Sequence, residues 1–308
     1  MPTFVDSLPP TLKTVWSFAQ ELFQEYQEDD CFTLGAALSY YTIFSIAPII
    51  VIVVAVSGFV FGPDAVRGEL YGNLAGLVGS DAATQIQDLV KNSYQSDAGI
   101  ITTIIGIVTL VFGATGVVNQ LKKSLNIIWE MKAVPKNGIV KFLLDRVLSL
   151  GLILSLGFVL LVTLVIEGVV AALSNQIEAL VPAISGPILI AVNFAISLLL
   201  TGGLFAFIFK LLPDARVQWS DALRGGVFTA VLFALGRIGI GYYLARGNIS
   251  ETFGAASFLV ILLVWVYYSS QILFLGAEFT QVYARRYGAK IYPTSNSVRV
   301  KRTEVPVQ

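Results

Sequence analysis

Residues 255–284, AASFLVILLVWVYYSSQILFLGAEFTQVYA, decide the fold of this chain. A helix of about 20 apolar residues crosses the hydrocarbon core of a bilayer, and it satisfies its backbone polar groups within the segment. Five stretches upstream have the same length and character. The sequence therefore predicts six transmembrane helices, at residues 36–61, 99–118, 145–172, 185–209, 221–245 and 255–284.

The composition excludes an ordinary soluble domain. Hydrophobic residues make up 56% of the 308 residues, and only 13% are charged. A soluble domain carries about 25% charged residues to keep its surface in water. We expect an all-α polytopic membrane protein whose transmembrane domain covers residues 36–284.

The basic residues predict the orientation of the spans. Segments that would share one side of the membrane hold 16 Lys and Arg residues, whereas the opposite loops hold 3. The positive-inside rule then places the N-terminal segment 1–35 and the basic tail 285–308 in the cytoplasm. No cleavable signal sequence precedes the first span, which we expect to act as an uncleaved anchor. The tail is expected to lie against anionic lipid headgroups.

Residues 10–28 have the periodicity of an amphipathic helix. Apolar side chains recur every three or four residues, namely Leu12, Val15, Trp16, Ala19, Leu22, Phe23 and Tyr26. The other face is polar and acidic. We expect an interfacial helix that packs under the bundle, with Glu21, Glu25, Glu28, Asp29 and Asp30 on its solvated side.

The external loop at residues 62–98 is the only long one predicted outside. It has the pattern of two short amphipathic helices, the second of which begins near Ser80 as N-cap. Two interpretations stay open: a pair of interfacial helices that shields the bundle, or a lid over an outward opening.

Glu278 is the ionisable residue that the last span has to accommodate. A charged side chain at the bilayer centre costs about 2.5–3.5 kcal/mol on insertion scales, so it needs a partner or a wet cavity. Helical spacing places it on one face of the span with Tyr267, Gln271, Gln281 and Arg285. This polar seam must face the interior of the bundle.

Two further charges lie nearer the outer surface. Arg237 is in the fifth span and Glu167 is near the outer end of the third. They are a candidate ion pair. The alternative is that both side chains reach the outer interface separately.

Polar residues also occur at the cytoplasmic half of the first two spans. Tyr41 and Ser45 lie in the first span, and Asn119 closes the second. With Glu278 and Gln271 they either line a cavity open to the cytoplasm or form static hydrogen bonds between helices.

Proline and paired glycine mark two places where a span can bend. Pro48 is in the first span, and Gly202 and Gly203 are in the fourth. Such residues kink or unwind a helix where a cavity or a neighbour satisfies the freed backbone. The alternative is that the glycines serve close helix packing.

Several chemical classes lack the residues that they need. The chain has no histidine, and its single cysteine, Cys31, excludes an internal disulfide and a cysteine metal cluster. No phosphate-binding loop, zinc-protease or nucleophile-elbow motif is present. We expect neither an enzyme nor a metal or other cofactor, and no nucleic-acid partner.

Four stretches in order resemble the BrkB/YihY family of bacterial inner-membrane proteins. They are AALSYYTIFSIAP at 36–48, LNIIW at 125–129, LPDARVQW at 212–219, and WVYY at 265–268 with GAE at 276–278. The resemblance extends from about residue 32 to 288. It implies six helices with both termini inside. Members were once labelled as a ribonuclease, but this chain lacks the clustered carboxylates or histidines that nuclease chemistry uses.

Two functions fit these features. The first is a transporter or a translocator of lipids or amphiphilic molecules, with Glu278 as the residue that contacts substrate or coupling ion. The second is a structural or assembly protein of the envelope, in which the polar seam only locks helices together. Membrane lipids are the expected partners on both hypotheses, and formation of a homo-oligomer is left open.

Overall fold

The computed structural model describes residues 10–45, 100–134, 146–155, 185–246 and 257–300, and the single positions 138, 143 and 157. Almost all of these residues are helical. The helices are α1 (Pro10–Glu28), residues 31–45, α5 (Ile100–Ile128), Arg146–Ser155, α7 (Ser185–Leu211), α8 (Trp219–Arg246) and α10 (Ser257–Arg286).

Among the described residues, three helices are long and apolar enough to cross a membrane, and they confirm the last three predicted spans. Their apolar stretches are Phe194–Leu211, Trp219–Ile240 and Leu259–Arg286. The described parts of the other three predicted spans are helical, and α5 continues ten residues past the predicted end at residue 118. The count of six stays a prediction. The external loop 62–98, Pro48 and Glu167 lie outside the described residues.

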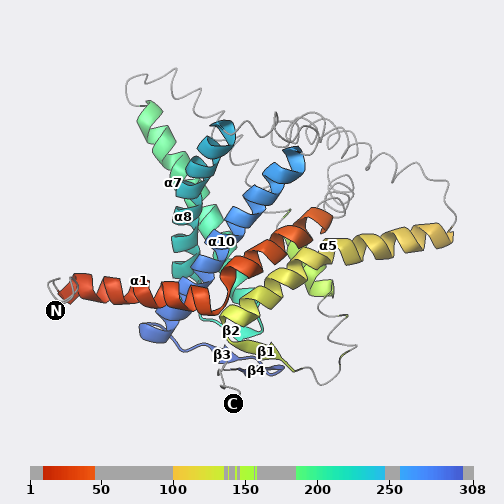
Figure 1. Cartoon of the computed structure of the whole chain (residues 1–308), viewed down its shortest axis with the longest axis horizontal. Coiled ribbons are helices and arrows are strands. Elements are labelled where there is room, and N and C mark those ends of the chain that lie inside the picture. Colours follow the sequence, from red (N-terminus) through yellow and green to blue (C-terminus); the bar gives the residue numbers. More distant parts are fainter. Residues whose placement is uncertain are drawn as a thin grey trace, which may run out of the picture.

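Helices α7, α8 and α10 pack side by side through small residues (Figure 1). Gly226 of α8 lies against α7, where a Cβ atom would approach Ala206 N to 2.8 Å and the Gly202 carbonyl oxygen more closely still. Small residues of this kind let helix backbones approach in a membrane. Gly203 has open space around it, and α7 is helical through both glycines.

A reciprocal pair of glycines and threonines joins α8 to α10. Gly225 of α8 packs on Thr280 of α10, and Gly276 of α10 packs on Thr229 of α8. Each threonine donates its hydroxyl to the glycine carbonyl four residues earlier in its own helix, at 2.6 Å for Thr229 and 2.7 Å for Thr280. The hydroxyls are thereby satisfied inside the apolar contact.

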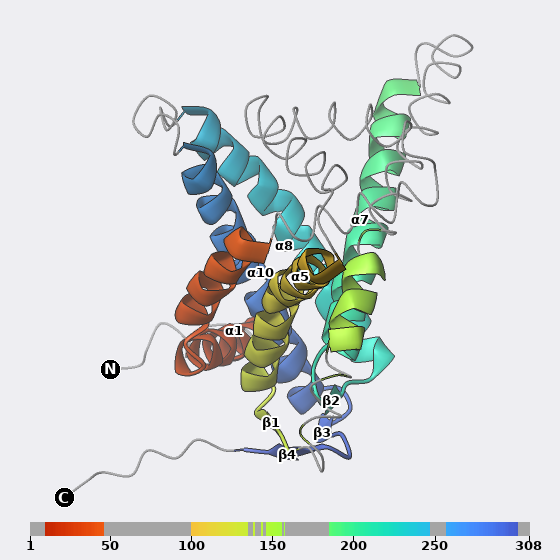
Figure 2. The same cartoon turned by 90° about the vertical axis from the view of Figure 1, so that its right-hand side faces the viewer.

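Two small antiparallel sheets close one end of the helices (Figure 2). Strand β1 (Met131–Ala133) pairs with β4 (Ser297–Arg299), and β2 (Ala215–Arg216) pairs with β3 (Tyr292–Pro293). The chain after α10 is therefore folded onto the loops that follow α5 and α7 up to residue 300. Contact of the tail with lipid headgroups stays a prediction.

The sheets also test the prediction of which loops lie on the same side of the membrane. The segment after α5, the segment after α7 and the C-terminal strands lie together at the end of the helices that is rich in Lys and Arg, here called the basic end. Helix α1 contacts α10 at the same end. These segments share one side, as predicted; that this side is the cytoplasm stays a prediction.

The tightest core lies just inside the basic end. Trp129 and Phe209 are buried with their ring centroids 6.0 Å apart, and Leu125, Ile128 and Val217 are buried with them. Burial of such side chains supplies about 1.5–3 kcal/mol each. This core joins α5 to α7 and positions the loops that carry the strands.

Candidate functional site

Glu278 is a buried residue of α10. It lies beside the turn that joins α1 to the helix of residues 31–45. Its side chain is 0% exposed, and its Oε1 atom accepts a weak hydrogen bond from Cys31 Sγ at 3.5 Å. It lies two helical turns, or about 10 Å, from Arg285 at the basic end. The carboxyl groups of Asp29 and Glu25 lie near it, and Asp29 also shares a side-chain hydrogen bond with the Glu278 carboxyl. No salt bridge to Glu278 occurs among the described residues.

Three buried polar atoms on this face of α10 have no hydrogen-bond partner among the residues that the structure describes. They are Gln271 Nε2, Glu278 Oε2 and Gln281 Oε1. Buried polar groups in folded proteins are nearly always paired, and each unpaired group costs about 1–3 kcal/mol. The predicted seam thus exists, and it retains unused donors and acceptors.

The N-terminal segment covers the seam. The Tyr26 hydroxyl donates a hydrogen bond to Gln271 Oε1, and Gly35 makes room for the Gln271 amide, since a Cβ atom at Gly35 would clash with it. Tyr267, one helical turn further from the basic end than Gln271, is 36% exposed. The seam therefore faces residues 26–35. These residues precede the first predicted span, which begins at residue 36.

The covering residues titrate abnormally. Burial, followed by the neighbouring Cys31, Tyr267 and Glu278, raises the pKa of the Tyr26 phenol. Burial, followed by the charge of Glu278, raises the pKa of the Cys31 thiol. Both groups are neutral at physiological pH, and Cys31 lacks the polarising surroundings of a reactive thiol.

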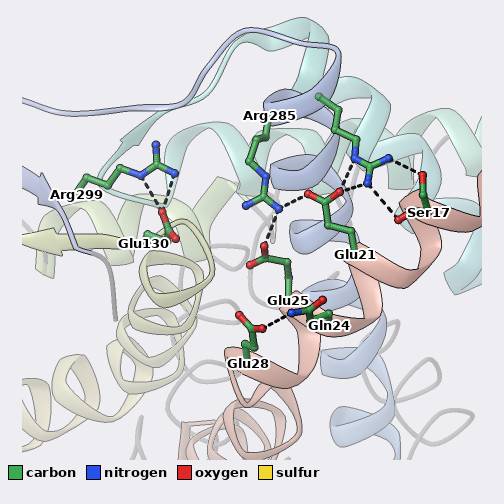
Figure 3. A network of polar contacts seen from close by, with 9 residues as sticks. Ser17, Glu21, Gln24, Glu25, Glu28, Glu130, Arg285 and Arg299 are labelled. Carbon is green, nitrogen blue, oxygen red and sulfur yellow. Dashed lines mark hydrogen bonds and ion pairs between the residues drawn. The ribbon is translucent and has the colours of Figure 1, made fainter. Parts of the chain in front are cut away.

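Ion pairs hold α1 across the end of α10 (Figure 3). Arg285 pairs with Glu21 and, at 2.6 Å, with Glu25, while Arg286 pairs with Glu21 and donates to Ser17 Oγ at 3.1 Å. We call these contacts the latch. Glu21 and Glu25, which were predicted to lie on the solvated side, are partly exposed, and they also pair with the two arginines at the end of α10, which was not predicted from the sequence.

Aromatic packing supports the latch. Phe18 of α1 meets Phe279 edge-on at 5.4 Å between ring centroids, and it stacks against Tyr287 at 6.5 Å. Such pairs contribute about 0.5–1.5 kcal/mol beyond area burial. Helix α1 is thus seated by one charged and one aromatic set of contacts.

Ser45 and Tyr41 are not part of this site. Ser45 donates its hydroxyl to the Gly113 carbonyl of α5 at 2.5 Å, and Tyr41 and Ser45 both lie over Gly116. Asn119 accepts a hydrogen bond from Ser149 at 3.3 Å. Ser45 and Asn119 thus form hydrogen bonds between predicted spans, whereas Tyr41 packs beside Gly116.

Arg237 lies on an exposed part of α8. Its proposed partner Glu167 is outside the described residues, so the outer ion pair stays a prediction. No group of three or more His, Cys, Asp or Glu side chains suited to a metal ion occurs in the described ranges.

The structure joins two stretches that carried the family resemblance. Asn126 donates to Asp214 Oδ2 at 3.0 Å and accepts from the Asp214 backbone N–H at 2.8 Å. Lys122 lies 3.2 Å from the same carboxylate, and the Asp214 carbonyl accepts from Ser297 at 2.6 Å. The motifs therefore build the junction between α5, α7 and the C-terminal strands.

These features define an α-helical membrane protein with an N-terminal helix seated on a buried polar seam. The family model described as "Virulence factor BrkB" matches residues 22–300. The chain belongs to this BrkB family, as the resemblance indicated.

Curated relatives support the assignment. The chain is 27% identical to a UPF0761 membrane protein of Saccharophagus degradans over 91% of this chain and 62% of the relative. It is 30% identical to one of Pseudoalteromonas translucida over 82% of this chain and 81% of that relative. A third, from Rhodospirillum centenum, is 26% identical over 89% of this chain and 59% of its own length. The chain thus spans about three fifths of the first and third of these relatives. No solved structure matches it.

Proposed function

We propose that this protein is a transporter or translocator of lipids or amphiphilic molecules in a bacterial inner membrane, with both termini in the cytoplasm. Glu278 is the residue that contacts the substrate or a coupling ion. The observation that carries the proposal is the set of unpartnered atoms on α10, namely Gln271 Nε2, Glu278 Oε2 and Gln281 Oε1, among the described residues.

The unpartnered atoms favour binding over static locking. A seam that only held helices together would gain most by pairing every buried polar group. A buried carboxylate without a cationic partner is costly in a membrane and is characteristic of substrate and ion pathways. Donors and acceptors that stay free in one conformation are available to a ligand in another.

The latch supplies the element that would open the site from the basic end. Exposed ion pairs such as Arg285–Glu21 and Arg286–Glu21 contribute about 0–1 kcal/mol each. Displacing α1 therefore requires less free energy than separating α8 from α10, because α8 and α10 are closely packed through glycine and threonine. In this conformation α1 and residues 31–35 cover Glu278, so the proposal assigns the structure to a closed state.

The structural alternative has its own supporting observation. Gln271 is bonded to Tyr26 and fitted to Gly35, and Cys31 covers Glu278. A seam filled in this way also suits an assembly protein without transport. The two functions differ in what removal of the Glu278 charge does.

Translocation of a fluorescent short-chain phospholipid in proteoliposomes, read by dithionite bleaching, tests the proposal. We expect Glu278→Gln to abolish translocation at unchanged abundance and melting temperature. Glu130→Gln, which removes the carboxylate that pairs with Arg299 at the strands, away from the seam, is the control and should retain it. Full activity of Glu278→Gln would refute the role of Glu278. Absence of wild-type flux together with an unstable Glu278→Gln variant would favour the structural alternative.

Cys31 provides a direct readout of the cover because it is the only cysteine and is 0% exposed. We expect the double substitution Arg285→Gln and Arg286→Gln to speed the reaction of Cys31 with a membrane-impermeant maleimide. Arg299→Gln removes a comparable exposed pair at Glu130 and should leave the rate unchanged. Equal rates in the two variants would show that the latch does not hold the cover.

A further inference from the structure

Helix α1 has three faces, and the contacts with α10 among the described residues lie on one of them. We propose that its outer apolar face, formed by Leu12, Trp16 and Phe23, is seated in membrane lipid at the basic end of the bundle. This inference concerns a lipid-binding surface and does not depend on transport.

The first face of α1 contacts α10. It carries Phe18, Glu21, Glu25 and Tyr26, which make the aromatic contacts, the latch and the bond to Gln271. At 100° per residue these side chains span about 140° of the helix circumference. The bundle therefore uses less than half of α1.

The second face is apolar and exposed. Leu12 is 51% exposed, Trp16 is 47% exposed and Phe23 is 56% exposed. Their spacing of four, seven and eleven residues places them in one stripe along the helix. The sequence had predicted this set to pack under the bundle; of its seven members, Tyr26 is the one that is buried.

The third face is polar and exposed. It carries Lys13, Gln20, Gln24 and Gln27, which lie on the other side of the apolar stripe from the contact with α10. Apolar and polar stripes that adjoin on an exposed helix are the pattern of a helix in the plane of the lipid interface. Three faces thus match three surroundings: protein, lipid and water.

The latch places α1 at the depth where these surroundings meet. Arg285 and Arg286 end the apolar stretch Leu259–Arg286 of α10, so they mark the boundary between hydrocarbon and headgroups. Figure 1 shows α1 running across the direction of α7, α8 and α10 at this end. A helix fixed crosswise at that level presents its free apolar face to lipid.

The apolar stripe continues onto the next helix. Phe32 is exposed and meets Tyr26 edge-on at 5.3 Å between ring centroids, and Tyr40 and Phe44 are exposed further along residues 31–45. Tyr40 and Phe44 lie in the first predicted span, and Phe32 lies just before it; the outer surface of a transmembrane helix faces lipid. Continuity with that surface favours lipid over a protein partner.

Nitroxide scanning of the full chain in phosphatidylethanolamine and phosphatidylglycerol vesicles tests the inference. Single cysteines at Leu12, Trp16 and Phe23, with matched controls at Lys13, Gln20 and Gln24, are labelled in a Cys31→Ser background. Power saturation then compares collision with oxygen, which concentrates in hydrocarbon, and with a neutral nickel chelate, which stays in water. Circular dichroism and elution volume identify folded variants.

We expect the first three positions to favour oxygen and the three controls to favour nickel, in opposite phase with a period of about 3.6 residues. High nickel accessibility at all six positions would place the whole outer surface of α1 in water and overturn the inference. Low accessibility to both reagents at Leu12, Trp16 and Phe23 would also overturn it, because a second copy or another protein would then cover the stripe.

Discussion

Substitution of Gly226 by alanine tests the packing that joins α7 to α8. A Cβ atom at this position would lie 2.8 Å from Ala206 N and 2.9 Å from Ala206 Cβ. Apolar contacts are optimal at about 3.5–4.0 Å, so α7 would have to retreat by at least about 0.7 Å, and further at the Gly202 carbonyl oxygen, which lies closer still. The obstructing atoms belong to the α7 backbone and to a Cβ, and neither can rotate away.

The expected cost follows from that displacement. A gap of about 0.5–1 Å forfeits a quarter to a half of the dispersion energy between the separated surfaces. Insertion of a methyl group into a close-packed core destabilises by about 1–3 kcal/mol. Gly239→Ala in the same helix is the control, because no atom lies within 4 Å of its new Cβ. It has the same gain in helix propensity, so the difference between the variants isolates the contact.

The free energy of unfolding can be measured by titration with dodecyl sulfate in mixed micelles. Loss of helicity and reaction of the single Cys31 with a fluorogenic maleimide give two readouts of the same transition. We expect Gly226→Ala to be less stable than Gly239→Ala by about 1–3 kcal/mol. Equal stability of the two variants would refute the claim that α7 and α8 approach at Gly226.

Three further outcomes follow from the described contacts. Asp221→Ala removes the buried acceptor of the Ala289 backbone N–H, 3.1 Å away, so we expect a loss of about 1–3 kcal/mol and faster trypsin cleavage after α10; cleavage at the wild-type rate would contradict this. Asn126→Ala leaves Asp214 without both of its side-chain amide contacts and should lower the unfolding free energy by about 1–3 kcal/mol, whereas an unchanged value would show that the junction adds no stability. Because burial and then Glu278 raise the pKa of Cys31 above its ordinary value of 9.0, the folded protein keeps a proton that the unfolded chain loses. Stability should be full below pH 9 and fall above it by up to about 1.4 kcal/mol per pH unit; Cys31→Ser should flatten this slope between pH 8 and 10.5, and an unchanged slope would assign it to other groups.

The spans could be predicted because hydropathy over 20 residues is a property of one segment. The stretch that contains Phe274 and Glu278 is apolar enough to be read without knowledge of its neighbours, and α10 begins and ends within two residues of the predicted 255–284. The strands could not be predicted in this way. Strand β1 is three residues long and β2 is two, and each depends on a partner more than 70 residues away in sequence.

For the site, likewise, the part that lies within one helix could be predicted and the part that depends on a second helix could not. Helical periodicity correctly aligned Gln271, Glu278 and Gln281 on one buried face. It could not identify Tyr26 and Cys31 as their partners, because periodicity within one helix says nothing about which helix covers it. The opposite charges of α1 and the end of α10 were the signal that could have predicted their contact. An acidic α1 and an Arg-Arg pair at the end of the last span are complementary, and both were assigned separately to water and headgroups.

The positions of these contacts determine which part of the molecule would move in a transport cycle. The contacts of α8 with α7 and α10 place backbone atoms and Thr hydroxyls against glycines, and separating them forfeits close-packed surface. The contacts of α1 with α10 are the ion pairs of two arginines, one aromatic cluster and the hydrogen bond from Tyr26 to Gln271, and the ion pairs contribute about 0–1 kcal/mol each. If the outer face of α1 is seated in lipid, α1 can leave Glu278 without leaving the interface. Lipid contact and the latch would then act on the same helix, and the lipid at the basic end would influence how often Glu278 is uncovered.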